Sequence, residues 1–321
     1  MAGASGFANS EKAATLDSIL DSLFSDSDRV VHFHNGFAAV EAVGGVLGTP
    51  VALTPLQPPF MLQGLLQSGR QMHLLDVDYY GGISGNRTDA TLFKTDYAGI
   101  MPSCDGGIEC WINGAGYLQR RPEGDHTLID LQTLDAHSET PGCVVISDDG
   151  RLLDELRRFA TLGVEKRQVW NDAIAIKGTD GLMSPLAARY WKERLDALRE
   201  ASNELQEIAG IYAETFSPLK LIDLIPTAYP KFFPVRLAPE LLCPKEDIYL
   251  ELHRMGIDAT VPFKPLYRYD ICKGEMLRGS EAFYKAVLAL PTHGLRLDEA
   301  REMAQKFLDL IGKYSYRGCS F

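Results

Sequence analysis

Residues 29–48 read RVVHFHNGFAAVEAVGGVLG. The β-branched and aromatic run at the start predicts a short strand, Asn35-Gly36 predicts a turn, and the small apolar residues that follow predict a helix. This order is the strand–loop–helix beginning of an α/β unit. Further strand-like runs lie at 50–53, 72–77, 108–112 and 142–147, with helical patterns between several of them. The alternation predicts an α/β protein with a mostly parallel sheet covered by helices.

The pattern changes at Ser184, which has the chemistry of an N-cap and is followed by Pro185 at the first helical position. The apolar stripe of the predicted long helix, which runs to about Tyr212, consists of Leu186, Tyr190, Leu195, Leu198, Leu205 and Ile208. Beyond it we expect a strand at 232–237, a helix at 245–255, a strand at 258–263 and a final amphipathic helix. We therefore expect a large domain over residues 1–200 and a small α+β C-terminal domain over 201–321.

The composition excludes several classes of protein. The 321 residues are 45% apolar, which suffices for a buried core, and 32 Lys and Arg against 43 Asp and Glu give a net charge of -11. This charge and the lack of a basic stripe argue against a nucleic-acid partner. No apolar run approaches the roughly 20 residues of a membrane span, and no secretory signal begins the sequence, so we expect a cytoplasmic protein. The six scattered cysteines predict reduced thiols and no zinc site.

The C-terminal third carries the most recognisable pattern, in GIDATVPFKPLY (256–267), SEAFYKAVLALPTH (280–293) and LRLDEAREMAQKFLDLI (295–311). Matching segments precede it in the same order: HNGFAAV (34–40), HLLDVDYY (73–80), PGCVVISDDGRLLDELRRFATLG (141–163) and the long helix from Gly181. Over nearly its whole length the chain resembles the DegT/DnrJ/StrS-type sugar aminotransferases. The resemblance implies the PLP-transferase fold of the aspartate aminotransferase type, a dimer, and amino transfer to a keto group of a nucleotide-linked sugar.

The family binds pyridoxal phosphate (PLP) through a lysine that precedes the glycine of the following strand. Here that window reads Thr133-Leu134-Asp135, and the nearest lysines in the sequence are Lys94 and Lys166. Because the Schiff base requires an amine within reach, the resemblance predicts that the cofactor lysine is lost at Leu134.

Four other positions that the family uses for PLP are also altered. Asn113 stands where the family has the acid that faces the pyridine nitrogen. The phosphate loop reads Asn35-Gly36-Phe37, in which the backbone could still bind an anion but a ring replaces the hydroxyl. Phe60 is the one aromatic residue that could substitute for the ring-stacking residue, and it lies several residues away from that position. Asp180 replaces an asparagine that reaches the phosphate of the neighbouring subunit, and its carboxylate would repel that phosphate. The five changes together predict that PLP is not used.

Two residues of the altered window are candidate catalytic groups. Some dehydratases of the family carry histidine in place of the lysine, and His137 with Asp135 could supply acid–base chemistry. Those dehydratases keep the acid and the phosphate groups, which this chain does not.

Four further residues are candidates for the lining of a substrate pocket: His34, Asn35, Tyr79 and Tyr80. His32 and His34 alternate on the first strand and face the same way, but the sequence offers no third ligand nearby, so we predict no metal site.

The leading interpretation is a degenerate member of the aminotransferase fold without a cofactor. We expect a non-catalytic subunit or small-molecule binding protein of amino-sugar or natural-product biosynthesis, as a homodimer or a heterodimer with an active paralogue. Two alternatives stay open. One is a cofactor-independent enzyme that uses His137, Asp135, His34 or Asn113, and the other is a PLP-dependent aminotransferase or dehydratase whose lysine lies elsewhere. The sequence does not name the substrate.

Overall fold

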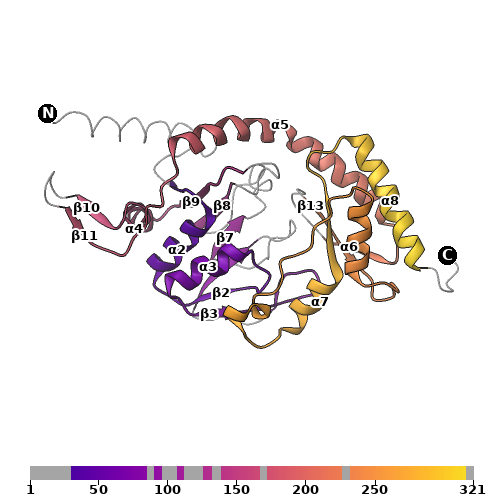
Figure 1. Ribbon diagram of the computed structural model, residues 1–321, viewed down its shortest axis with the longest axis horizontal. Coiled ribbons are helices and arrows are strands. Elements are labelled where there is room, and N and C mark those ends of the chain that lie inside the picture. Colours follow the sequence, from indigo (N-terminus) through magenta and orange to yellow (C-terminus); the bar gives the residue numbers. More distant parts are fainter. Residues whose placement is uncertain are drawn as a thin grey trace.

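The computed structural model describes residues 30–84, 90–95, 107–111, 126–131, 139–166, 172–225 and 232–315. They form a large α/β part and a smaller α+β part, and one long helix, α5 (Pro185–Phe216), runs along both (Figure 1). A search of these described residues finds no helix that is long and apolar enough to cross a membrane.

The large part is built on a seven-stranded sheet in the order β1-β9-β8-β7-β6-β2-β3. Its strands are β1 (Val30–Phe33), β2 (Val51–Leu53), β3 (Met72–Leu74), β6 (Thr91–Thr95), β7 (Ile108–Trp111), β8 (His126–Asp130) and β9 (Cys143–Ser147). Four neighbouring pairs, from β3 to β8, are parallel, whereas β9 runs antiparallel to both β8 and β1. The predicted α/β class with a mostly parallel sheet is confirmed.

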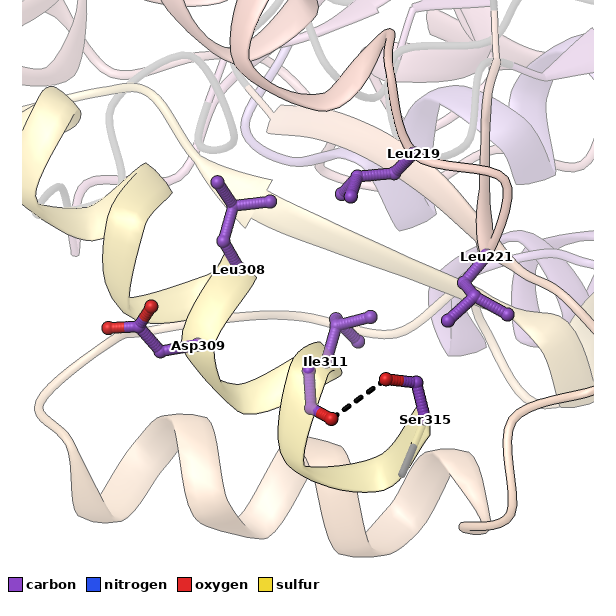
Figure 2. Close-up of a pocket in the computed structure, with 7 residues that line it drawn as sticks. Leu219, Leu221, Leu308, Asp309, Ile311 and Ser315 are labelled. Atoms are coloured by element: carbon purple, nitrogen blue, oxygen red, sulfur yellow. Dashed lines mark hydrogen bonds between the residues drawn. The ribbon is translucent and has the colours of Figure 1, made fainter. Parts of the chain in front are cut away.

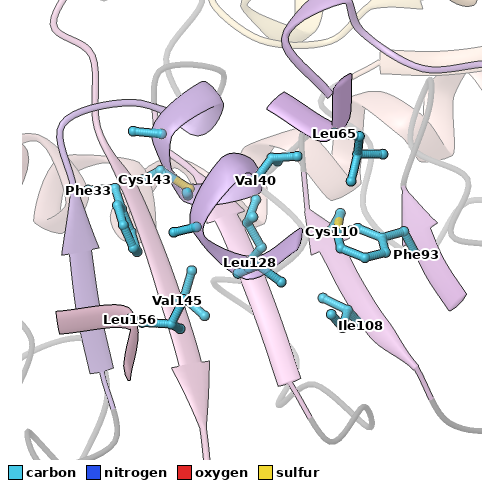
Figure 3. Close-up of a cluster of buried hydrophobic side chains, with 14 of the residues drawn as sticks. Phe33, Val40, Leu65, Phe93, Ile108, Cys110, Leu128, Cys143, Val145 and Leu156 are labelled. Carbon is cyan, nitrogen blue, oxygen red and sulfur yellow. The ribbon is translucent and has the colours of Figure 1, made fainter. Parts of the chain in front are cut away.

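One face of this sheet packs against α2 (Gly36–Leu47), α3 (Pro59–Ser68) and α4 (Gly150–Ala160) (Figure 3). The core on this face includes Phe33, Val40, Leu65, Phe93, Ile108, Leu128, Val145 and Leu156, all at most 1% exposed. Because side chains alternate along a strand, the residues next to these on each strand point to the opposite face. His32, Lys94 and Glu109 are three of them.

The long helix α5 begins as predicted. The Ser184 side chain accepts a hydrogen bond from the backbone N–H of Ala187 at 3.2 Å, and Pro185 is the first helical residue. The helix ends at Phe216, beyond the predicted end near Tyr212. The start of the predicted apolar stripe is wrong, because Leu186 is 80% exposed whereas Trp191 is 1% exposed.

The smaller part has its own core. The C-terminal half of α5 packs with α6 (Lys245–Arg254) and α8 (Leu297–Ser315) against an antiparallel sheet of β12 (Ile222–Leu224), β13 (Phe232–Leu237) and β14 (Val287–Pro291). Tyr212, Phe216, Phe233 and Phe307 form an aromatic cluster at its centre. Helix α5 passes through position 200 without a break, so the two parts share one element.

The single strand predicted at 72–77 is wrong. The chain forms β3 and then β4 (Asp76–Val77), which pairs with β5 (Ile83–Ser84) in a separate hairpin. Asp76 explains the break, because its carboxylate accepts hydrogen bonds from the backbone N–H groups of Gly279 and Ser280, at 2.9 and 2.7 Å. These residues begin α7 (Arg278–Ala286), so Asp76 ties the large part to a helix of the C-terminal third.

The strand predicted at 258–263 is also wrong. Thr260 makes an isolated bridge with Ala289, and the chain on either side has no further strand pairing. Pro262, two residues after Thr260, has no N–H group, so it cannot donate the next hydrogen bond of the ladder.

Candidate functional site

The carboxyl ends of the parallel strands and the start of α2 meet at one edge of the large sheet. Ligands of open α/β sheets bind at such an edge. Strand β1 ends at Phe33, and His34 and Asn35 lead directly into α2. The Asn35 side chain caps this helix by accepting a hydrogen bond from the backbone N–H of Ala38 at 2.9 Å. The predicted pocket residues His34 and Asn35 therefore lie at this edge, next to Gly36 and Phe37.

The ring of Phe60 lies against the first turn of α2. A Cβ placed on Gly36 would be 2.7 Å from one ring carbon of Phe60 and 3.0 Å from another. Phe60 is a residue of the first turn of α3, whose start carries Pro59 in place of a side-chain cap. The structure thus brings together Gly36 and the aromatic residue that the sequence placed several positions from the ring-stacking site.

Asp180 lies in the segment that runs beside β1. The backbone N–H of His34 donates to the carbonyl of Gly181 at 2.8 Å, and Leu182 forms an antiparallel bridge with Phe33. Asp180 itself bridges Thr161 after α4, and its side chain is exposed. The loop before Ser184 is therefore fixed to the same edge of the sheet, while the Asp180 carboxylate faces solvent in this chain.

Four predicted site residues, Asn113, Leu134, Asp135 and His137, lie outside the described residues. Asn113 belongs to the connection after β7, and the other three belong to the connection between β8 and β9. Both connections leave or enter the sheet at the edge where α2 begins.

The predicted pocket residue Tyr79 joins the two parts of the molecule. Its ring lies under the guanidinium of Arg236 at 3.9 Å, and Arg236 also donates to the Tyr79 carbonyl at 3.0 Å. The Tyr79 hydroxyl donates to the Asp223 carboxylate, and this bond raises the pKa of Tyr79. Tyr80 packs edge to face on Tyr79 and is 53% exposed.

Trp191 is a further candidate site residue, which the sequence analysis did not single out. A Cβ on Gly142 would be 2.8 Å from the indole Nε1 of Trp191 and 3.0 Å from Cε of Met183. Gly142 directly precedes β9, and its carbonyl accepts from the backbone N–H of Leu131 at the end of β8. The indole of α5 thus covers the sheet at its carboxyl edge. The sequence does not reveal this contact, because Trp191 and Gly142 lie far apart in the chain and their spacing carries no signal that pairs them.

Five buried polar atoms in the described part of the chain have no hydrogen-bond partner: His32 Nε2, His34 Nδ1, Gln57 Oε1, Thr95 Oγ1 and Trp191 Nε1. His34, Thr95 and Gln57 lie at or just beyond the carboxyl ends of β1, β6 and β2, and Trp191 lies beside the start of β9. Buried polar groups in proteins are nearly always paired, so a group of exceptions at one edge calls for a ligand or water. Burial, and then the charge of Arg157, lower the pKa of His32 to about 4.

A separate depression lies in the small part, at the C-terminal end of α8 (Figure 2). Its volume is about 460 Å³, and its lining is Leu219, Leu221, Leu308, Asp309, Ile311, Gly312 and Ser315. This lining is mostly aliphatic and offers little acid–base chemistry. Among the described residues no three His, Cys, Asp or Glu side chains gather as a metal site.

A profile of the DegT/DnrJ/EryC1/StrS aminotransferase family matches residues 138–307, which include the start of β9, the Asp180 loop, α5 and most of the small part. The chain belongs to this family. A related protein, the UDP-4-amino-4,6-dideoxy-N-acetyl-beta-L-altrosamine transaminase of Campylobacter jejuni, is 24% identical over 311 residues, which cover 86% of this chain and 82% of the transaminase.

Solved structures of sugar aminotransferases have the same fold. Helicobacter pylori PseC, an aminotransferase involved in the biosynthesis of pseudoaminic acid, aligns with a TM-score of 0.82 at 16% identity, over 94% of this chain and 92% of PseC. The sugar aminotransferase CalS13 from Micromonospora echinospora aligns with a TM-score of 0.78 at 15% identity, over 92% and 91% of the two chains. The predicted PLP-transferase fold is confirmed.

Within this DegT/DnrJ/EryC1/StrS member, Lys94 is the lysine nearest in sequence before the window 133–135, where the resemblance places the cofactor lysine of the family. Its Nζ lies 3.3 Å from a carboxylate oxygen of Glu109, and both side chains are less than 10% exposed. Lys94 stands directly opposite Glu109 on the neighbouring strand, and the pair lies on the face of the sheet opposite α2.

Proposed function

We propose that this family member does not bind PLP through a Schiff base, and that it acts as a binding protein or non-catalytic subunit in nucleotide-sugar or related natural-product biosynthesis. The absence of lysine from the sequence between Lys94 and Lys166 carries the proposal. That interval contains β7, β8, β9 and the whole connection between β8 and β9. Lys94 is held against Glu109 on the face away from α2, and Lys166 belongs to the strand β10 (Val164–Lys166) beyond α4.

The described part of the phosphate site also fits PLP poorly. An anion at a helix N-terminus needs free space above the first backbone N–H groups. Here the Phe60 ring covers Gly36, and the Asn35 side chain already caps Ala38. Phe37 offers no hydroxyl. These contacts support a pocket whose polar groups serve another ligand, and the family relationship suggests a nucleotide sugar as that ligand.

An exposed apolar surface supports self-association or pairing with an active paralogue. Leu162, Ile174, Leu182 and Leu186 are 55%, 81%, 44% and 80% exposed. The backbone N–H of Leu162 donates to the Thr179 carbonyl and that of Ala175 donates to the Gly163 carbonyl. These bonds bring the segments of Leu162 and Ile174 together around the strand pair of β10 and β11 (Asp172–Ile174). Adjacent exposed apolar side chains are typical of protein interfaces, and in a two-fold dimer the same patch contacts itself.

A second candidate function is cofactor-independent acid–base catalysis. The observation that favours it is His34, whose buried Nδ1 has no hydrogen-bond partner and lies at the ligand-binding edge. In this alternative His137, Asp135 and Asn113 remain the other candidate groups. Turnover of a nucleotide sugar in the absence of any cofactor, lost in His34→Gln, would favour this alternative over the binding protein.

Cofactor binding tests the main proposal. Purified protein incubated with PLP is expected to show no Schiff-base absorbance, and borohydride reduction followed by peptide mass spectrometry is expected to find no pyridoxyl-lysine. A family member with an intact lysine is the positive control. A pyridoxyl adduct on a lysine of this pocket would overturn the proposal and restore the aminotransferase interpretation.

Light scattering after size-exclusion chromatography tests the interface. We expect a dimer, alone or with the paralogue, that is weakened by Ile174→Asp. The matched control is Ile271→Asp, because Ile271 is also exposed, at 60%, but lies in the C-terminal third outside the patch. A monomer in both samples would exclude the subunit function and leave the lone binding protein.

A further inference from the structure

His34 and Trp191 both lie at the end of the β1–β9 strand pair, at the carboxyl edge of the large sheet. Strand β1 pairs with β9 so that His32 is opposite Val144 and Phe33 is opposite Cys143. The next residue along β1 is His34, where the chain bends toward α2, and the residue before Cys143 is Gly142, so these two residues lie close together at the end of the ladder. The Trp191 Nε1, 2.8 Å from the Cβ position of Gly142, therefore lies at the same end of the β1–β9 pair as His34.

The two nitrogen atoms have complementary requirements. The indole N–H of Trp191 can only donate, and Nδ1 of a neutral imidazole can accept. Both atoms are buried and have no hydrogen-bond partner. Trp191 is 1% exposed and packs against Gly142 and Met183, so its indole has little freedom to turn toward another acceptor. A hydroxyl group satisfies both at once, because it accepts from the indole and donates to the imidazole.

The described surroundings of the pair favour a neutral ligand group. Met183 packs on Gly142 beside the indole, and Leu182 next to it bridges Phe33. His32, on the same face of β1, remains uncharged at neutral pH because burial and then Arg157 lower its pKa to about 4. A carboxylate or phosphate at this place would gain the indole N–H of Trp191, while His32 on this face carries no charge to offset its own, so its desolvation would be poorly compensated.

We propose that Trp191 and His34 together bind one hydroxyl group of a sugar, as the part of the pocket that recognises the sugar rather than the nucleotide. This inference rests on the proposed binding function. Gln57 and Thr95, the unpartnered buried groups near β2 and β6, lie at the same edge and offer further contacts to a polyhydroxylated ligand.

Indole NMR tests the proposal directly. The chain has three tryptophans, Trp111, Trp170 and Trp191, so a ¹⁵N-tryptophan sample gives few indole signals. They are assigned with Trp191→Phe, or by elimination with Trp111→Phe and Trp170→Phe if that variant does not fold. The probes are UDP-N-acetylglucosamine, N-acetylglucosamine and UDP. We expect both sugars to move the Trp191 indole signal downfield and UDP alone to leave it in place.

The affinity of variants gives the second readout. Trp191→Phe removes the N–H group but keeps a ring, and we expect a Kd for UDP-N-acetylglucosamine that is about three- to tenfold higher, as for a lost neutral hydrogen bond. Tyr190→Phe is the control, because Tyr190 is the neighbouring aromatic residue, packed edge to face on Trp191. Its Kd is expected to stay unchanged.

Three outcomes would overturn the proposal: binding of the sugar without movement of the Trp191 signal, the same movement with UDP alone, or no binding of any probe. Each can be told apart from failure of the proposed function, because PLP adducts are measured separately in the same samples. A protein that forms the PLP adduct can still show or lack the sugar-dependent indole shift.

Discussion

The contact between Gly142 and Trp191 predicts a steric defect in Gly142→Ala. The backbone of Gly142 has no positive φ, so alanine is tolerated by the main chain and the effect comes from the added methyl group. That methyl would lie 2.8 Å from Trp191 Nε1, which is much closer than an ordinary van der Waals contact of 3.4–4 Å. Trp191 is 1% exposed and has little room to retreat. Overpacking of this kind destabilises by about 1–3 kcal/mol.

Urea unfolding of the variant measures the effect, with the m-value as a check that the same surface is exposed. The control is Gly210→Ala in α5, where an added Cβ meets nothing within 4 Å, so alanine should stabilise the helix by about 0.5–1 kcal/mol. Trp191→Phe should partly relieve the clash, and the double variant should then lose less than the sum of the single variants. Wild-type stability in Gly142→Ala, or strict additivity in the double variant, would refute the packing argument.

Two further predictions concern the contact of Asp76 with α7 and the window in which the resemblance places the cofactor lysine. Partial burial alone would raise the pKa of Asp76, but hydrogen bonds from Gly279, Ser280 and Val77 outweigh it and hold the pKa below its ordinary value. The stability that Asp76 contributes is therefore present above the pKa of the unfolded chain and lost as the pH falls through the lower, folded value. Asp76→Asn should lower the free energy of unfolding at neutral pH by about 1 kcal/mol and reduce its fall in acid, measured by urea unfolding at several pH values; an unchanged acid profile would contradict this. Leu134→Lys alone should give no amino transfer to a keto sugar in a coupled assay with PLP and an amino donor, because one group does not restore the remaining electrostatic preorganisation; measurable transfer would show that the pocket is less altered than proposed.

The order of strands and helices was predictable because each element carries its own signal. The turn at Asn35-Gly36, the cap at Ser184 and the proline at 185 act within a few residues of the elements they begin. The break after β3 was not predictable in this way. It depends on Asp76 binding the start of α7, which lies in the C-terminal third of the chain.

In the candidate site, too, some features were predictable from the sequence and others were not. That Phe37 and Asp180 replace PLP-binding residues of the family is still a prediction from the resemblance, and the structure places both residues beside the carboxyl edge. Trp191 was missed because the apolar face of α5 was assigned to start at Leu186, which is exposed. In the first turns of α5, Ala188 and Trp191 are buried and Leu186 is exposed, so the buried positions do not follow the spacing that was predicted for the apolar face of this helix.

The buried polar groups of the large sheet are of two kinds, those paired with each other and those without a hydrogen-bond partner. In the middle of the sheet, Lys94 and Glu109 are buried, but each compensates the charge of the other. At the carboxyl edge, Nδ1 of His34 and Nε1 of Trp191 are buried without a hydrogen-bond partner. An uncompensated buried donor or acceptor costs about 1–3 kcal/mol, and an apolar residue at either position would avoid that loss. Retention of polar atoms where apolar ones would be more stable is the physical signature of a site that is completed by something other than the chain itself.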